Sequence, residues 1–113
     1  WQRGRSLVAE VYRVTRQPPL SHDIDLVRQM RRSAVSITSN IAEGFERGRA
    51  TEFHQFLSVA KGSCGELRSQ MYNAWDVGYL DEQTFQDLRA KAEETGRIIG
   101  GLRASVERRK ATW

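Results

Sequence analysis

The sequence SHDIDLVRQMRRSAVSITSNIAEGF occupies residues 21–45 and carries an apolar side chain at every third or fourth position. This spacing gathers the apolar side chains on one face of an α-helix, and no alternating pattern typical of a β-strand competes with it. Ser21 is a good N-cap, with Asp23 in the first turn. The predicted core positions are Ile24, Val27, Met30, Ala34, Ile37 and Ile41. We therefore expect one long amphipathic helix over residues 21–45.

Three further helices are predicted from the same period on either side of this stretch. The first ends at Gln17-Pro18-Pro19, because two consecutive prolines cannot continue a helix, and Gly78 is the expected C-terminal cap of the third. The predicted helices cover residues 2–16, 21–45, 50–77 and 81–108. In the last helix the core positions are Phe85, Leu88, Ala92, Thr95, Ile99, Leu102 and Val106. Short connections make neighbouring helices antiparallel, so we predict an all-α fold, a single domain over residues 1–113 that forms an up-down-up-down four-helix bundle.

The composition excludes several classes of protein. A chain of 113 residues is too short for a large multidomain enzyme, and 39% hydrophobic residues with two prolines indicate a folded rather than a disordered chain. The longest stretch without a charge, residues 33–42, is too short to cross a bilayer, so no membrane association is expected. The single cysteine, Cys64, cannot form an internal disulfide, which favours a reducing, cytoplasmic location.

The positive charge is concentrated in the first half of the chain. Residues 1–50 carry nine arginines against five carboxylates, whereas residues 51–113 carry nine basic and nine acidic side chains. This asymmetry favours an anionic partner such as RNA or DNA, although arginine-rich helices on an ordinary soluble surface would look the same. The candidate nucleic-acid-binding residues are Arg28, Arg31, Arg32, Arg47 and Arg49.

A stripe of small, mostly uncharged polar residues runs along residues 21–45, away from the predicted core face. Serine, threonine and asparagine are mediocre helix formers, and solvent-exposed helix faces favour Glu and Lys instead. The pattern favours an oligomer interface or a polar network over a plain surface or a ligand site. The candidates for this role are Gln29, Ser33, Ser36, Asn40 and Glu43, together with Glu66 on the next helix.

Four glycines interrupt the last two helices. Each costs about 1 kcal/mol relative to alanine inside a helix, so the close approach of another backbone is the expected compensation. These glycines are Gly62, Gly65, Gly96 and Gly100.

The sequence contains no convincing catalytic pattern. Two histidines, His22 and His54, are too few and too far apart for the usual zinc motifs, and Cys64 falls on a core position. Glu43 and Glu66 could meet across two helices, but the paired Glu-x-x-His motifs of metal-binding bundles are missing. We therefore predict no enzyme activity, no catalytic residues, no metal and no cofactor. A small metalloenzyme using these two glutamates remains the enzymatic alternative.

Three segments together identify a family resemblance. They are Gln29-Met-Arg-Arg-Ser-Ala-Val-Ser-Ile-Thr-Ser-Asn-Ile-Ala-Glu-Gly44, Glu52-Phe-His-Gln-Phe-Leu-Ser-Val-Ala-Lys-Gly-Ser-Cys-Gly-Glu-Leu67 and Gly78-Tyr-Leu80. The chain resembles the four-helix-bundle proteins encoded in 23S rRNA intervening sequences, a family similar to the Avd accessory proteins of diversity-generating retroelements. The positions that match the family signature are Gln29, Arg32, Ser36, Asn40, Glu43, Gly44, Ser63 and Glu66.

The resemblance implies a cytoplasmic bacterial protein without known catalysis that assembles into a ring, in this family a homopentamer. Avd-like proteins are basic and associate with nucleic acid and a reverse transcriptase. Three hypotheses follow, of which we favour a homo-oligomer that binds RNA or DNA through arginines. The second is a structural adaptor that recruits a protein partner and has no direct nucleic-acid role. The third is the small metalloenzyme.

Overall fold

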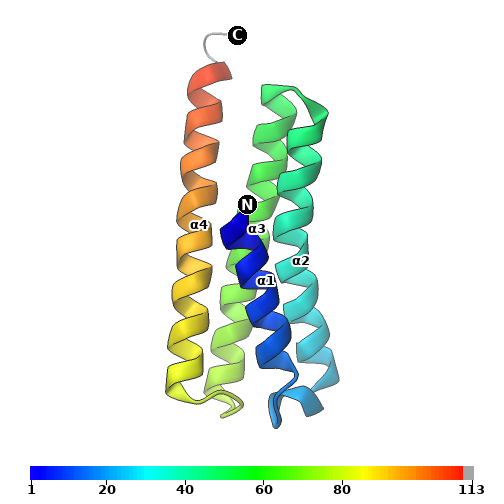
Figure 1. Cartoon of the computed structure of the whole chain (residues 1–113), viewed down its shortest axis with the longest axis vertical. Coiled ribbons are helices and arrows are strands. Elements are labelled where there is room, and N and C mark those ends of the chain that lie inside the picture. The colour runs from blue at the N-terminus through cyan, green and yellow to red at the C-terminus, as the bar shows by residue number, and fades with distance from the viewer. Residues whose placement is uncertain (111–113) are drawn as a thin grey trace.

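The computed structural model describes residues 1–110 and contains there four α-helices and one short 3-10 helix. The α-helices are α1 (Gln2–Thr15), α2 (Ile24–Arg47), α3 (Ala50–Asp76) and α4 (Glu82–Lys110), and the 3-10 helix covers Leu20–His22. The chain direction alternates from each helix to the next, and the helices form a rod of 50 × 21 × 20 Å (Figure 1). The predicted all-α, four-helix fold is confirmed. The last three residues of the predicted domain 1–113 lie outside the described residues.

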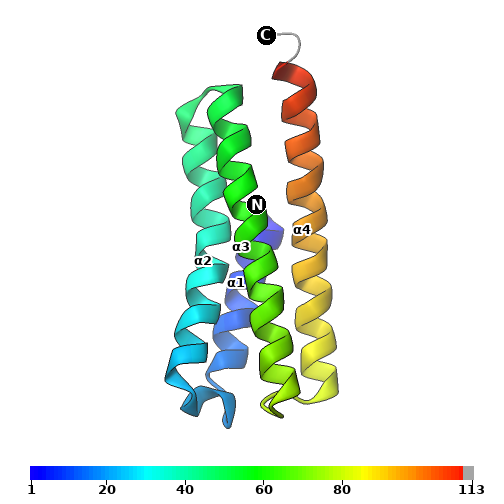
Figure 2. The same cartoon turned by 180° about the vertical axis from the view of Figure 1, so that it is seen from behind.

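The helices form a square in which each one packs against two neighbours. The contacting pairs are α1–α2, α2–α3, α3–α4 and α4–α1, so α1 and α3 lie on opposite sides of the bundle (Figures 1 and 2). Helix α1 has 14 residues, whereas α2, α3 and α4 have 24, 27 and 29. The N-terminus therefore lies about halfway along the rod (Figure 1). The bundle has a four-helix half, which contains α1, and a three-helix half beyond it.

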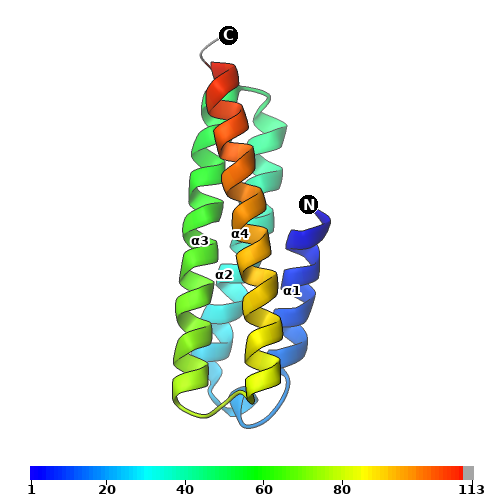
Figure 3. The same ribbon diagram turned by 90° about the vertical axis from the view of Figure 1, so that its left-hand side faces the viewer.

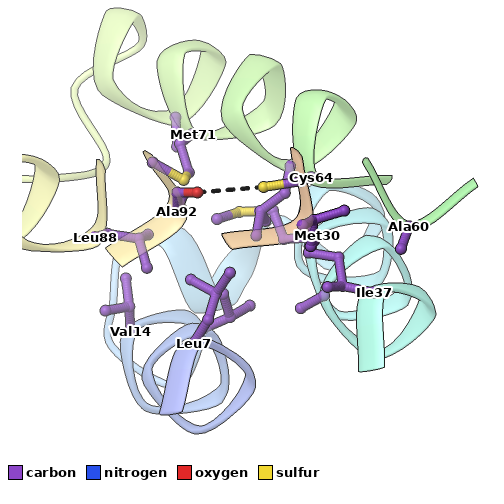
Figure 4. Close-up of a cluster of buried hydrophobic side chains, with 14 of the residues drawn as sticks. Leu7, Val14, Met30, Ile37, Ala60, Cys64, Met71, Leu88 and Ala92 are labelled. Atoms are coloured by element: carbon purple, nitrogen blue, oxygen red, sulfur yellow. Dashed lines mark hydrogen bonds between the residues drawn. The ribbon is translucent and has the colours of Figure 1, made fainter. Parts of the chain in front are cut away.

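The core is made of the apolar side chains that recur every three or four residues. Figure 4 shows side chains from all four helices meeting between them, with Cys64 among them as the core spacing predicts. Burying one such side chain stabilises the fold by about 1.5–3 kcal/mol. The largest apolar side chains that are fully buried are Leu7, Val11, Leu20, Met30, Ile37, Leu57, Leu67, Met71, Leu88 and Ile99.

Helix α2 begins later than its sequence predicts. Ser21 lies in the 3-10 helix, and the N-cap is Asp23, whose Oδ1 accepts a hydrogen bond from the Leu26 amide at 3.1 Å. The other carboxylate oxygen of Asp23 accepts from the Tyr79 hydroxyl at 3.0 Å, which ties this helix end to the α3–α4 connection. The prediction that Ile24 is a core residue was wrong. Its side chain is 66% exposed because the first turn of the helix places it on the outer side.

At its other end α2 continues through Gly44 to Arg47 and stops at Gly48, which adopts a left-handed conformation with φ of 72°. Gly44 is needed for packing rather than for a turn. A Cβ at this position would lie 2.6 Å from the Phe56 Cβ and 3.0 Å from the Phe53 Cδ1, so only glycine lets α3 approach this closely.

The glycines inside α3 and α4 behave differently, and the expectation of a close backbone contact at them was wrong for this chain. A Cβ at Gly96 or Gly100 would meet only side-chain atoms, the Cys64 sulfur at 3.5 Å and the Lys61 ammonium at 3.7 Å. At Gly65 the nearest atom is a guanidinium nitrogen of Arg68 at 4.0 Å, and at Gly62 there is open space. Packing within the described chain therefore does not require glycine at these four positions.

Leu102 was also predicted wrongly as a core residue. Arg3, near the start of α1, pairs with Glu94 at 2.9 Å, which puts the N-terminal end of α1 level with that residue of α4. Leu102 lies about two turns beyond Glu94 along α4, past the level at which α1 begins. Its side chain is consequently 37% exposed.

The substitution Gly44→Ala tests the close approach of α2 and α3. The new methyl group would overlap with Phe56, so we expect a loss of about 1–3 kcal/mol in the free energy of unfolding, measured by urea denaturation. The matched control is Gly62→Ala, which meets no atom within 4 Å and should be neutral or stabilising by up to about 1 kcal/mol. Equal stabilities of the two variants would contradict the packing role of Gly44.

The capping of α4 predicts a pH dependence. The Thr84 amide donates to the Asp81 Oδ1 at 2.7 Å, and this hydrogen bond lowers the pKa of the Asp81 carboxyl below its usual value. A carboxyl with a depressed folded-state pKa stabilises the fold above its unfolded pKa of about 3.9, and this contribution is lost as the pH falls through the folded pKa. Asp81→Ala should therefore lower the Tm at pH 7 and have a shrinking effect below about pH 4, whereas Asp81→Ser should retain part of the cap.

Candidate nucleic-acid interface

A groove between α1 and α2 collects four of the nine arginines of the first half of the chain. It has a volume of about 810 Å³ and lies in the four-helix half. Its floor and walls include the apolar side chains Ile24, Val27 and Val35, beside Tyr12 and Thr15 of α1. Its basic residues are Arg16, Arg28, Arg31 and Arg32. We refer to it as the arginine groove.

Among the four arginines of the groove, Arg31 has a structural role because it contacts α1. Its Nε donates to the Thr15 hydroxyl at 2.9 Å, and its guanidinium lies 4.6 Å from the centre of the Tyr12 ring. Thr15 is only 1% exposed and itself donates to the carbonyl of Val11 at 2.7 Å. Arg31 therefore fastens α2 to α1 and fixes the shape of the groove.

The other three arginines of the groove are free to bind a ligand. Arg16, Arg28 and Arg32 are exposed, and none of them forms an ion pair within residues 1–110. Arg28 and Arg32 are four residues apart and so project from adjacent turns of one helix face. Arg16 follows the last residue of α1 and faces the same groove from the other side. Three unpaired guanidinium groups around one concave surface make an attractive site for an anion.

The predicted arginines do not form one site, because Arg47 and Arg49 lie near the opposite end of α2. Sixteen residues separate Arg31 from Arg47, which corresponds to about 24 Å along a helix. Arg47 donates to the Glu43 carboxylate at 2.9 Å and lies 5.3 Å from the centre of the Phe56 ring. Arg49 is exposed in the short connection before α3. These two arginines are therefore separate from the arginine groove.

The residues of the predicted polar stripe of α2 also fall into two groups, one buried or bonded within the chain and one exposed. Ser33 is buried, and the Ser36 and Ser63 hydroxyls form a hydrogen bond of 2.8 Å between α2 and α3. Asn40 Nδ2 donates to the Ser36 carbonyl at 2.8 Å and to its hydroxyl at 3.0 Å. Ser36, Asn40 and Ser63 therefore form a polar network at the α2–α3 contact of one chain, whereas Ser33 is buried without a hydrogen bond to them. Gln29, Glu43 and Glu66 instead lie exposed on the surface of the chain.

The cysteine and the two histidines are not placed together in a reactive site. The Cys64 thiol donates to the Ala92 carbonyl at 3.2 Å, and burial raises its pKa, which makes the thiolate less available. His54 pairs with Glu107 at 3.2 Å, and His22 is exposed. Across residues 1–110 no group of three or more His, Cys, Asp or Glu side chains is placed to hold a metal ion. None of the described helices is both long and apolar enough to cross a membrane.

The sequence model of one protein family, the 23S rRNA-intervening sequence protein family, matches residues 1–101. The chain belongs to this family. The match to the 23S rRNA-intervening sequence proteins spans α1, α2, α3 and most of α4, so it includes the arginine groove and the polar network. The family resemblance predicted from the sequence is thereby confirmed, whereas the relation to Avd stays a prediction. No curated protein matches the chain.

Sequence reasoning did not find Arg16 as a member of the groove. This arginine lies directly before the Gln17-Pro18-Pro19 turn. The helical period of the preceding residues shows only that Arg16 is not on the apolar face of α1. Which faces of α1 and α2 meet depends on the conformation of that turn, which periodicity does not reveal.

The structure predicts different effects for neighbouring arginines. Arg31→Ala removes a hydrogen bond to a buried hydroxyl and a cation–π contact, so it should lower the free energy of unfolding by about 1–2 kcal/mol. Arg32→Ala, the matched control on the next position, should change it by less than about 0.5 kcal/mol. Chemical denaturation of both variants checks this, and equal losses would contradict the fastening role of Arg31.

Proposed function

We propose that this 23S rRNA-intervening sequence protein is a non-catalytic, cytoplasmic accessory protein that binds RNA through the arginine groove. The observation that carries the proposal is the convergence of Arg16, Arg28 and Arg32 on one groove without ion-pair partners among the described residues. Guanidinium groups bind phosphate oxygens through paired hydrogen bonds, and the backbone phosphates dominate the affinity of nucleic-acid binding. The family name supports RNA as the nucleic acid.

The chemistry of the groove suits a single-stranded or irregular segment of RNA. Ile24 is exposed between the arginines and offers an apolar surface to a ribose or a base. Tyr12 lines the groove as well, although its ring already contacts Arg31. A strip of cations beside apolar and aromatic side chains is the usual composition of surfaces that bind unpaired strands.

We also propose that the protein acts as a homo-oligomer, with a pentamer as the expected form. A net charge of +4 is modest for one chain, but a ring of several chains places several arginine grooves on one particle. The exposed polar residues Gln29, Glu43 and Glu66 are the proposed contacts between chains, since Ser36 and Asn40 already bond within one chain. Arg47 and Arg49 would then serve as a second, weaker RNA contact.

The alternative function, an adaptor that recruits a protein, is favoured by a different surface. Phe45 is 70% exposed and makes an edge-to-face contact with Phe53, with ring centres 6.1 Å apart. Arg49 lies beside these two rings and lines the same small pocket. An exposed aromatic ring next to an arginine is typical of residues that dominate protein–protein binding.

RNA binding by the double variant Arg28→Ala/Arg32→Ala tests the main proposal. With a fluorescent single-stranded RNA, we expect weaker binding and a shallower dependence of the affinity on salt, by about 0.7 in log–log slope for each lost phosphate contact. The matched control is Arg5→Ala/Arg108→Ala, which removes the same charge at two exposed positions outside the groove. A third double variant, Arg47→Ala/Arg49→Ala, measures the contribution of the second arginine group.

Equal RNA affinity of the groove variant and the charge-matched control would refute the proposed interface. Light scattering of the same samples gives the number of chains per particle, and a monomeric wild type would refute the oligomer. Binding of a protein that survives nuclease treatment and is lost in Phe45→Ala would support the adaptor instead.

A further inference from the structure

A second basic cleft lies between α3 and α4, on the side of the bundle opposite the arginine groove. In Figure 3 these two helices face the viewer, with α2 behind them. The cleft has a volume of about 310 Å³, at the lower end of the range of about 300–1,000 Å³ found for ligand pockets. It is lined by Lys61, Cys64, Arg68, Ala92, Glu93, Gly96, Arg97 and Gly100.

The cations of this cleft are not neutralised by the protein. Lys61, Arg68 and Arg97 are exposed, and within residues 1–110 none of the three forms a hydrogen bond or an ion pair. The one carboxylate of the cleft, Glu93, is bound by the Arg89 Nε at 3.1 Å. Three like charges held around one cleft repel one another, so a bound anion would relieve this repulsion.

The floor of the cleft contains two glycines, although packing within the chain does not require glycine at either position. Gly96 and Gly100 lie one turn apart on α4, and alanine would fit at either position without a close contact. The buried Cys64 of α3 lies against Gly96, and burial raises the pKa of its thiol although the charges of Arg68 and Lys61 oppose this. Lys61 and Arg68 line the same cleft as Cys64, and a Cβ at Gly100 would lie 3.7 Å from the Lys61 ammonium. Because Gly96 and Gly100 have no side chains, the space beside the unpaired cations is left open for a ligand.

We propose that the α3–α4 cleft is a binding site for a phosphate group. A terminal phosphate carries up to two negative charges and three strong acceptor oxygens, and a backbone phosphodiester carries one charge and two such oxygens; either can bind guanidinium forks and an ammonium. The phosphate belongs either to the backbone of an RNA or to a small phosphorylated molecule. The site is independent of the arginine groove, because it uses other helices and the opposite face.

Two variants, each with a matched control, test the site. Lys61→Ala/Arg97→Ala removes two of its charges, and Arg5→Ala/Arg108→Ala removes the same charge elsewhere. Gly100→Leu fills the floor without changing the charge, and Gly101→Leu places the same side chain at a neighbouring position that faces open space. None of the substituted residues forms a side-chain hydrogen bond or ion pair among the described residues, and both glycine-to-leucine substitutions should raise the Tm through helix propensity.

The probes are inorganic pyrophosphate, followed by calorimetry, and a short single-stranded RNA, both measured in the Arg28→Ala/Arg32→Ala background. We expect the two cleft variants to weaken binding of at least one probe by about tenfold, and the two controls to change it by less than about twofold. An effect on pyrophosphate identifies a small phosphorylated ligand, and an effect on RNA alone identifies the RNA backbone.

The proposal is overturned if the background protein binds neither probe, or if the cleft variants bind both probes as the controls do. A loss in Lys61→Ala/Arg97→Ala without any loss in Gly100→Leu would show a diffuse attraction to charge and would also overturn it. Because the arginine groove is disabled in every sample, failure of this site is distinguishable from failure of the proposed RNA interface.

Discussion

The contact between α2 and α3 is the constraint on which the rest of the bundle depends. The connection between them is so short that the helices must turn back on each other, and the missing side chain of Gly44 lets Phe56 pack directly against the α2 backbone. Two turns earlier, the Ser36–Ser63 hydrogen bond fixes the register of the same pair. With the rotation of α2 determined in this way, Arg28 and Arg32 face α1. The arginine groove is therefore a consequence of packing on the other side of α2.

The distribution of charge along the chain is a poor guide to the distribution of charge on the surface. Residues 51–113 have no net charge, yet α3 and α4 form a cleft with three unpaired cations. Carboxylates of this half pair with other cations: Glu94 with Arg3 of α1, Glu107 with His54, and Glu93, which lines the cleft, with Arg89. The protein thus has basic surfaces on two opposite faces, although only the first half of its sequence is basic.

The fold could be predicted from the sequence because apolar residues repeat at helical intervals with few exceptions. The errors at Ile24 and Leu102 arose where a helix starts later, or where a neighbouring helix is too short to cover the position. The candidate site was predicted less well, since residues near in sequence, such as Arg31 and Arg32, have different partners, while Arg16 joins them from just beyond the end of α1. Periodicity tells which face of a helix is buried, but it does not tell which helix lies beside the polar face.

Because α1 reaches only halfway along the rod, the two halves of the molecule differ in how firmly they are held. In the four-helix half α2 and α4 each pack against two neighbours, whereas their ends beyond Trp1 lack α1 and pack against α3 alone. Local opening is easier where fewer apolar contacts must be broken, so backbone amides of the three-helix half should exchange with deuterium sooner than those beside α1. The arginine groove lies in the slowly exchanging half, whereas Phe45 and Arg49 lie at the end that opens first.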